Sequence, residues 1–476
     1  MRRILLAVVV VCLCHPPRVA TQPASLVFSH VNLIDGNGGP VQRDMSVVVS
    51  GGRISAIRRA EKASPSPTAQ VIDATGKYLI PGLWDMHVHW YDARLLTLFV
   101  ANGVTGVRQM WGMPLHIGWR DRVAKGELVG PRFAIASAIV DGPNPVWRGS
   151  LVVADENSAR QAVQRFQRDG YDFVKVYNRL PRDAYFALAN EAKLRGLPFA
   201  GHVPMAISAA EASDAGQRSI EHLDGILFGA SAIGDELRRK NAGVSTGGEA
   251  SLGIDPARRA ARRELREKAL ATYEPPRAAA LFARLAANGT WQCPTLTVLR
   301  SIASLDDPAF TSDPRLKYMP RQIRDSWNPA TDPRLATKTP ADYVQDRRVY
   351  SKHLEVVGGM RRAGVKFLAG TDVLNPFAFP GFSLHDELAL LVEAGFTPME
   401  ALQAATINPA LYLGQSKSLG TIETGKTADL VLLDANPLDD IANTKRIAAV
   451  VMAGRQWERA ALDAMLDQAE KTAAAK

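Results

Sequence analysis

The chain has 476 residues, which is more than one small domain and enough for a barrel of about 250–350 residues plus a smaller unit. Apolar residues make up 46% and charged residues 22%, as in globular enzymes. The formal net charge is +9, but the basic residues are dispersed, and the densest run, 258–268, alternates with Ala and Glu like an exposed helix face. This pattern argues against a nucleic-acid-binding protein. The partner that we expect is a small-molecule or dipeptide substrate.

The first twenty residues have the pattern of a secretory signal peptide. A basic start is followed by an apolar run over residues 4–14 and then by Ala20. The run is shorter than the roughly 20 apolar residues that a membrane span needs. We therefore expect removal of residues 1–20 and a secreted or periplasmic protein without stable membrane insertion. A lipoprotein anchor on Cys12 or Cys14 is the alternative.

Both ends of the remaining chain are rich in short strands and polar turns. In the N-terminal part, the turn Ser50-Gly51-Gly52 separates two apolar segments, which is typical of a hairpin. Each end alone is too small to bury a core, so we expect residues 24–80 and 415–458 to pair into one composite β-sandwich domain. The Ala-rich, charged residues 459–476 are expected to form a helical tail.

The long middle, residues 81–414, alternates short apolar strands with helical patterns. Eight strands are expected, over residues 83–89, 104–109, 133–137, 173–177, 199–203, 219–223, 290–296 and 365–372. Eight such units predict an α/β fold, a closed (β/α)8 TIM barrel. An open doubly wound sheet is the alternative, but no glycine-rich phosphate loop follows the first strand. Two long segments, 233–277 and 303–347, are expected to be helical insertions over the barrel mouth, and the first could act as a lid.

Histidines and one aspartate fall at the carboxyl ends of the expected strands. His87 and His89 are two residues apart in the first strand, so both side chains point to the same face. His202, His222 and Asp372 end three other strands. Barrel active sites are built at this end, and imidazole with carboxylate is a ligand set for divalent ions. The pattern therefore predicts a metal site.

A lysine lies among these positions. Strand alternation puts Phe173, Lys175 and Tyr177 on one face, which aims an ammonium group into the barrel interior. An unpaired charge there is very costly. Lys175 either forms a structural salt bridge or is modified by carbon dioxide to a carbamate, an anionic ligand able to bridge two metals.

Cys293 is expected to be a small buried hydrophobic residue.

The sequence resembles the amidohydrolase superfamily over about residues 27–455, and most of all its imidazolonepropionase-related, Xaa-Pro dipeptidase-like branch. The motifs that carry the likeness are PGLWDMHVH at 81–89, NGVTGVR at 102–108, Gly201-His202, Glu221-His222-Leu223, Gly370-Thr371-Asp372, GFTPMEAL at 395–402 and GKTADLV at 425–431. The resemblance implies a TIM barrel with a binuclear metal centre.

The implied ligand set divides between two divalent ions. His87, His89 and Asp372 would hold one, and His202 and His222 would hold the other. A carbamate on Lys175 and a hydroxide would bridge them. Zinc is the metal that the resemblance implies, with manganese as an alternative.

The implied reaction is hydrolysis of an amide-type carbon–nitrogen bond in a dipeptide or an N-acyl amino acid by a hydroxide generated at the metals. Asp372 is expected to accept the proton of the attacking water and to pass it to the leaving nitrogen. Tyr177 either donates a hydrogen bond to the substrate carbonyl or only packs. Arg108 either clamps a substrate carboxylate or forms a structural ion pair.

Other functions are compatible with the same residues. A lactone, a cyclic amide or a phosphotriester could be cleaved at the same metal site, and a non-enzymatic scaffold is a further alternative. Specificity depends on loops and insertions, whose geometry the sequence does not give. A homo-oligomer is also compatible with the sequence.

Overall fold

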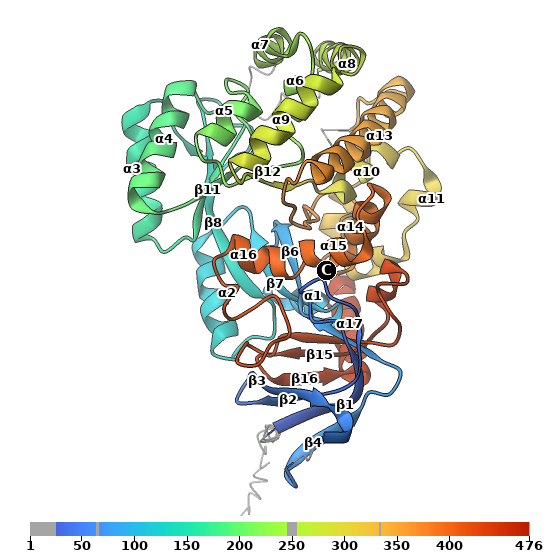
Figure 1. Cartoon of the computed structure of the whole chain (residues 1–476). Helices are drawn as coiled ribbons and strands as arrows, with labels where there is room; N and C mark the ends of the chain where they lie inside the picture. Colours follow the sequence, from blue (N-terminus) through green and yellow to red (C-terminus); the bar gives the residue numbers. More distant parts are fainter. Residues whose placement is uncertain (1–24, 63–65, 245–254, 333–334, 476) are drawn as a thin grey trace, which may run out of the picture.

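The computed structural model describes residues 25–62, 66–244, 255–332 and 335–475. The expected signal peptide, residues 1–20, lies outside these ranges. The chain forms a helix-surrounded barrel and a smaller sheet built from both ends of the sequence, which lies at the bottom of Figure 1. None of the described helices combines the length and the apolar character that a membrane crossing requires.

The barrel is a parallel sheet. Its strands follow the order β6 (Leu83–Val88), β7 (Val104–Gln109), β8 (Arg132–Asp141), β10 (Phe173–Val176), β11 (Phe199–Gly201), β12 (Ser219–Glu221) and β13 (Trp291–Cys293). A two-residue strand, β9 (Leu151–Val152), pairs with β8 beside this path. Seven of the eight expected barrel strands are therefore present.

The eighth expected strand, 365–372, closes the barrel without regular strand geometry. Its backbone hydrogen-bonds to β13 through Leu368 N and Gln292 O at 2.9 Å. On its other side Met86 N of β6 donates to Ala369 O at 2.8 Å. The segment leaves the extended conformation at Asp372, whose φ is +57°. The prediction of a closed TIM barrel is confirmed.

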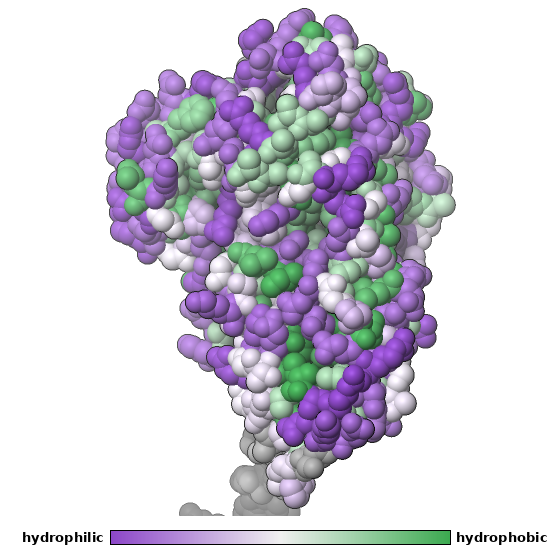
Figure 2. Space-filling model, viewed as in Figure 1, coloured by the Kyte–Doolittle hydropathy of each residue, from purple (hydrophilic) through white to green (hydrophobic). Residues whose placement is uncertain are grey.

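Helices surround the barrel. They are α1 (Thr97–Ala101), α2 (Pro114–Ala124), α3 (Glu156–Arg168), α4 (Arg182–Arg195), α5 (Ala209–Asp214), α6 (Ile226–Gly229), α9 (Pro275–Ala287), α10 (Leu296–Ser304), α14 (Phe382–Glu393), α15 (Pro398–Ala404) and α16 (Ile407–Tyr412). In α3 the buried residues Ala159, Ala162, Val163 and Phe166 follow the spacing of one helix face. The face of the molecule in Figure 2 is mainly hydrophilic with small apolar patches, as expected when helices bury such stripes.

The described parts of the two long insertions contain helices. The first contains α7 (Gly234–Val244) and α8 (Pro256–Ala271), which lie at the top of Figure 1. The second contains α11 (Pro308–Thr311), η4 (Pro314–Tyr318) and α12 (Arg321–Ser326), and it runs into α13 (Pro340–Arg362). The second insertion contributes Asp325, Ser326, Trp327, Thr331 and Asp332 to the wall of the large cavity described below.

The smaller domain joins the two ends of the chain. Its strands are β1 (Ser25–Leu33), β2 (Gln42–Ser50), β3 (Arg53–Arg59), β4 (Ala69–Asp73), β5 (Tyr78–Pro81), β14 (Leu430–Leu433), β15 (Ile447–Met452) and β16 (Arg455–Glu458). The N- and C-terminal parts meet where β5 pairs antiparallel with β14, in the register Leu79 opposite Leu432. The expected pairing of the two ends is confirmed.

The strands of this domain belong to one continuous mixed sheet, where two stacked sheets were expected. The sheet curls until β3 reaches the chain before β14, because Ile54 N donates to Lys426 O at 2.9 Å and Gly425 N donates to Ile54 O at 2.8 Å. Its inner face packs on itself through alternating residues such as Phe28 and Leu432. The tail helix α17 (Arg459–Ala474) packs against α1 and η4 of the barrel unit.

Candidate metal centre

Five of the predicted ligands converge at the carboxyl ends of the barrel strands. The Nε2 atoms of His87 and His89 lie 3.3 Å apart. Asp372 Oδ1 lies 3.3 Å from His87 Nε2 and 3.1 Å from His89 Nε2. Asp372 Oδ2 lies 3.8 Å from His222 Nε2, and the rings of His222 and His202 have centroids 4.8 Å apart. Segments that are distant in sequence therefore bring one carboxylate and four imidazoles together.

The spacing of His87, His89 and Asp372 fits a shared ion. Two ligand atoms bonded at about 2.0–2.1 Å in tetrahedral geometry lie about 3.3 Å apart. The three edges of this triangle measure 3.1–3.3 Å. The residues present therefore fit a divalent metal ion.

The far side of each of three imidazoles is held by a hydrogen-bond acceptor. His87 Nδ1 donates to Glu221 Oε2 at 2.8 Å, and His202 Nδ1 donates to Asn178 Oδ1 at 2.8 Å. His222 Nδ1 donates to Thr295 Oγ1 at 2.7 Å, whose own proton goes to the Pro294 carbonyl. With a proton on Nδ1, the Nε2 lone pair is available as a ligand. This is how proteins orient metal-binding histidines.

The electrostatics also favour the ligand form of these groups. Burial and the nearby Lys175 lower the pKa of His87 and of His202 well below the ordinary value. Burial lowers the pKa of His222 as well. Burial acts to raise the pKa of Asp372, but His222, His89 and Lys175 outweigh it, so that this pKa is lowered. Neutral imidazoles and an ionised carboxylate are the states that bind a cation.

Backbone conformation at the strand ends contributes to this geometry. His222, Thr295 and Asp372 have φ values of +58°, +50° and +57°. These values lie in the left-handed region, which residues other than glycine rarely adopt. Such residues gather at functional sites, where the surrounding structure compensates for the strain. Gly370 permits the closing segment to approach β6, because a Cβ there would lie 2.5 Å from Cys293 Sγ and 2.9 Å from the His87 backbone nitrogen.

Lys175 lies beneath the histidines on β10 and is fully buried. Its ammonium nitrogen has no hydrogen-bond partner and no ion pair among the described residues. Burial lowers its pKa to about 8. The structural salt bridge considered as one alternative is therefore absent from the described part of the chain. A buried, unpartnered nitrogen among metal-type ligands is compatible with the other alternative, a modified lysine.

The two expected substrate-binding residues differ in their placement. Tyr177 lines the large cavity, and its hydroxyl accepts a hydrogen bond from Trp147 Nε1 at 2.8 Å. Arg108 is fully buried and does not line that cavity. Its guanidinium donates to Glu221 Oε2 at 2.8 Å and to Ser219 Oγ at 2.9 Å. Of the two alternatives for Arg108, the structure therefore shows the structural ion pair, and the substrate clamp is wrong.

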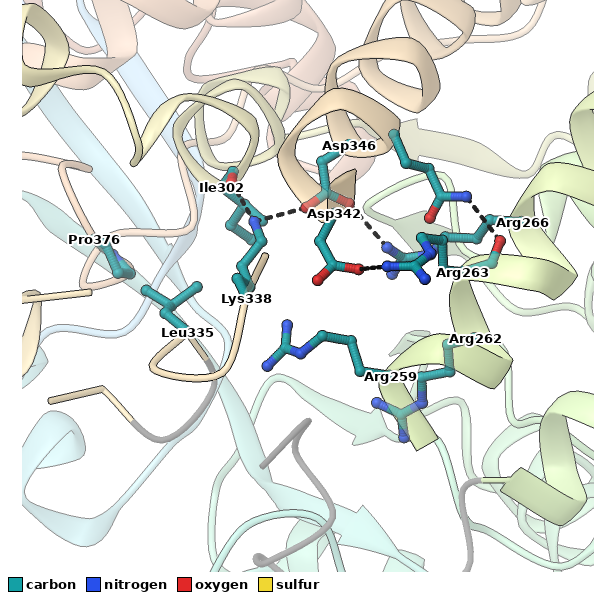
Figure 3. A pocket seen from close by; sticks show the side chains of 11 residues that line it. Arg259, Arg262, Arg263, Arg266, Ile302, Leu335, Lys338, Asp342, Asp346 and Pro376 are labelled. Atoms are coloured by element: carbon teal, nitrogen blue, oxygen red, sulfur yellow. Dashed lines mark hydrogen bonds and ion pairs between the residues drawn. The ribbon is translucent and has the colours of Figure 1, made fainter. Parts of the chain in front are cut away.

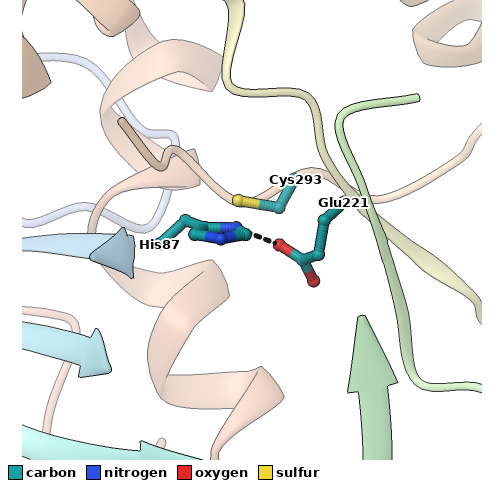
Figure 4. A group of neighbouring side chains, drawn as sticks. All are labelled: His87, Glu221 and Cys293. Atoms are coloured by element: carbon teal, nitrogen blue, oxygen red, sulfur yellow. Dashed lines mark hydrogen bonds and ion pairs between the residues drawn. The ribbon is translucent and has the colours of Figure 1, made fainter. Parts of the chain in front are cut away.

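Glu221 is a buried member of this site that sequence reasoning missed. It joins His87 to Arg108, and it lies on β12 with Ser219, whose hydroxyl donates to its other oxygen at 2.5 Å. Strand alternation places Ser219 and Glu221 on the same face of β12, so the inward direction of Glu221 could have been predicted. Its contact with His87 of β6 could not, because that contact arises only when the barrel closes. Figure 4 shows His87 facing Glu221 with the sulfur of Cys293 beside them. Burial raises the pKa of the Cys293 thiol far above its usual value, so it stays a neutral buried group, as expected.

A large cavity opens above the histidines. Its volume is about 1010 Å³. Five of its lining side chains are aromatic, namely Tyr91, Trp111, Trp147, Tyr177 and Trp327. His89, His202, His222 and Asp372 form its metal-facing end. The cavity is large enough for a small-molecule or dipeptide substrate.

A second, smaller hollow adjoins this cavity at Ile302 and is shown in Figure 3. Arginines of α8 face it, and two of them pair with carboxylates of α13: Arg263 with Asp342 at 2.9 Å and Arg266 with Asp346 at 3.0 Å. These ion pairs connect α8 of the first insertion to the part of α13 that belongs to the second insertion. The basic run in the sequence, expected to be an exposed face, is thus partly engaged in contacts within the chain.

Comparisons with known proteins agree with this architecture. Residues 296–456 match the model of the amidohydrolase family. An imidazolonepropionase of Pseudomonas putida (strain GB-1) is 25% identical over 421 residues, which cover 84% of this chain and 90% of that protein. Among solved structures, a bottromycin amidohydrolase superposes with a TM-score of 0.75 at 26% identity, covering 96% of this chain and 92% of the other.

A Xaa-Pro dipeptidase with bound methionine shares the fold. Its TM-score is 0.66 at 21% identity, with coverage of 91% of this chain and all of the other. The family match covers the C-terminal part of the barrel and the strands β14 and β15, while the relatives cover both domains. Together these matches support a place for the chain in the amidohydrolase superfamily, as a hydrolase that acts on carbon–nitrogen bonds.

Proposed function

We propose that the chain hydrolyses an amide bond in a dipeptide or an N-acyl amino acid at a centre of two divalent metal ions, with zinc as the resident metal. The observation that carries the proposal is the triangle of His87 Nε2, His89 Nε2 and Asp372 Oδ1, with edges of 3.1–3.3 Å. The same constellation is common to metal-dependent hydrolases that use imidazole and carboxylate ligands.

In this proposal His87, His89 and Asp372 would hold one ion, and His202 and His222 would hold the other. Lys175, converted to a carbamate by carbon dioxide, would supply a further, anionic ligand. The unpartnered Lys175 nitrogen supports this assignment, because a carbamate would replace a costly buried cation with an anionic ligand. When bound, the ions would supply Lewis acidity toward water and toward the substrate carbonyl.

The protein side chains then position the reactants and move the proton. Asp372 has one oxygen near His87 and His89 and the other near His222, so it reaches across the site where water would attack. It accepts the proton of that water and delivers it to the leaving nitrogen. The Tyr177 hydroxyl accepts a hydrogen bond from Trp147 Nε1, so the hydroxyl proton of Tyr177 is available to donate to the carbonyl oxygen of the substrate.

The test is Asp372→Asn in zinc-loaded enzyme supplied with bicarbonate. Dipeptides, N-acyl amino acids, lactones and phosphotriesters are assayed for kcat and KM, and bound zinc is measured in parallel. We expect amide hydrolysis by the native enzyme and a fall in kcat of about 10²–10⁴-fold in the variant with zinc retained, as for loss of a general acid–base group. Asp183→Asn, on the exposed first turn of α4, is the matched control. Full activity of Asp372→Asn, or hydrolysis of lactones or phosphotriesters without amides, contradicts the proposal.

A further inference from the structure

One wall of the large cavity is a run of aromatic rings that leads to the histidine cluster. Trp111 follows β7, Trp147 follows β8, and Tyr177 follows β10. The ring centroids of Trp111 and Trp147 are 6.4 Å apart, and Trp147 Nε1 donates to Tyr177 Oη at 2.8 Å. The Tyr177 ring lies 4.0 Å from the His202 ring, centroid to centroid. The run is therefore continuous to the metal-facing end of the cavity.

These rings are held from behind and face the cavity in front. Ile139, Val146 and Tyr177 form a small buried cluster against which Trp111 and Trp147 pack. Both tryptophans remain half-buried and line the cavity. Rings that served only as core would be covered on both faces. Held aromatic surface that lines a concave site is typical of ligand recognition.

Apolar and aromatic side chains line other parts of the same cavity as well. They are Val298, Leu299 and Ile302 of α10 and Trp327, whose Nε1 donates to Leu374 O at 3.0 Å. Trp147 and Trp327 are thus each fixed by a hydrogen bond, while polar residues of the second insertion, Asp325, Ser326, Thr331 and Asp332, also line the cavity. A rigid ring binds to fixed aromatic surface at a low entropic cost, because few rotatable bonds are frozen on binding.

We propose that the substrate carries an aromatic ring next to its scissile carbon–nitrogen bond and that Trp111 and Trp147 select it by stacking. This inference rests on the proposed amide hydrolysis and adds the substrate class. The ring lies next to the bond because the aromatic run ends at Tyr177 and His202, beside the predicted ligands. Offset or edge-to-face contacts between rings favour an aromatic group over an aliphatic group of equal size.

The experiment uses zinc-loaded full-length enzyme and two sets of dipeptides. Each set has a common partner residue and varies the other position among phenylalanine, cyclohexylalanine, leucine and alanine. We expect the phenylalanine member of one set to exceed its cyclohexylalanine counterpart in kcat/KM by about ten-fold, as for about 1.4 kcal/mol of aromatic contact. Trp111→Leu should reduce this preference to about two-fold, mainly through KM, and Trp111→Phe should restore most of it.

Trp457→Leu is the matched control, because this half-buried tryptophan lies on β16 in the smaller domain. Its preference should equal that of the native enzyme. Calorimetric affinities of uncleavable ketomethylene analogues of the same dipeptides give a second readout that requires no turnover. Equal affinity for phenylalanine and cyclohexylalanine analogues, or a preference that survives in a folded Trp111→Leu, overturns the inference. If the enzyme hydrolyses no amide but still binds the phenylalanine analogue selectively, the proposed function is overturned and the aromatic preference stands.

Discussion

His87 Nδ1 donates a hydrogen bond to Glu221 Oε2 at 2.8 Å, and both side chains are fully buried. The same oxygen accepts from Arg108 Nη2 at 2.8 Å. Glu221 thus links a predicted metal ligand to a buried cation, although His87 and Arg108 precede it by 134 and 113 positions in the sequence. The arrangement fixes the His87 tautomer with Nε2 facing the centre.

Glu221→Gln should weaken metal binding with little change in the ligands themselves. An amide is a poorer acceptor for His87 Nδ1–H than a carboxylate, so we expect the affinity for zinc to fall by about 10–100-fold. Competition with a chromogenic chelator measures it. Glu264→Gln, an exposed partner of Lys268 on α8, is the control and should match the native protein. Native zinc affinity in Glu221→Gln would remove Glu221 from the metal centre.

Arg108→Met should destabilise the protein. The substitution leaves Glu221 as a buried carboxylate without its cation, and loss of one partner of a buried pair costs about 3–5 kcal/mol. Urea unfolding of metal-free protein gives the free energy of unfolding. Arg160→Met removes an exposed pair with Glu156 on α3 and should change it by less than about 0.5 kcal/mol. A stable Arg108→Met enzyme with a raised KM for carboxylate substrates would instead support the clamp that the burial of Arg108 contradicts.

Lys175→Ala should lose both bound metal and activity. The variant cannot form a carbamate, so we expect kcat/KM to fall by about 100-fold or more, the upper range for loss of a group that supports a metal. Short carboxylic acids should restore part of the activity, because their oxygens can occupy the space of the missing side chain. Metal content and turnover are measured with and without added acetate. Lys193→Ala, an exposed lysine on α4, is the control. Two retained ions per chain in Lys175→Ala would exclude a bridging carbamate.

His385 should make stability depend on pH. It is buried on α14, where Nε2 donates to Asn102 O at 3.0 Å and Nδ1 contacts Thr444 Oγ1 at 2.9 Å. Burial lowers its pKa from 6.5 to about 4. Between these values the unfolded chain binds more protons than the folded one, so the contribution of His385 is present above pH 6.5 and is lost as pH falls toward 4.

The size of this effect follows from the shift, about 1.4 kcal/mol per pKa unit, or about 3 kcal/mol over the full range. Urea unfolding of metal-free protein at pH 7 and pH 4.5 measures it, and His385→Gln should show a shallower loss. His30→Gln, an exposed histidine of β1, should behave as the native protein does. Equal pH dependence of the native protein and His385→Gln would show that acid instability arises elsewhere.

The sequence by itself determined the barrel, the pairing of the two ends and the identity of the residues that converge. Strand alternation repeats every two residues, so His87 and His89 had to share a face. In a parallel barrel all strands end on one side, so residues that close different strands, such as His202 and Asp372, had to meet there. These are local properties of strands, and a single sequence displays them.

The tertiary structure alone decided which partners surround that cluster. Glu221 contacts His87 only because β12 and β6 face each other across the closed barrel, and Arg108 joins Glu221 for the same reason. Trp111 and Trp147 form one wall because two loops of unrelated sequence lie side by side. Asp372 reaches the cluster by turning into the left-handed region at the end of the closing segment, where its carboxylate lies 3.1 Å from His89 Nε2. Contacts of this kind depend on distances between segments, which no local periodicity encodes.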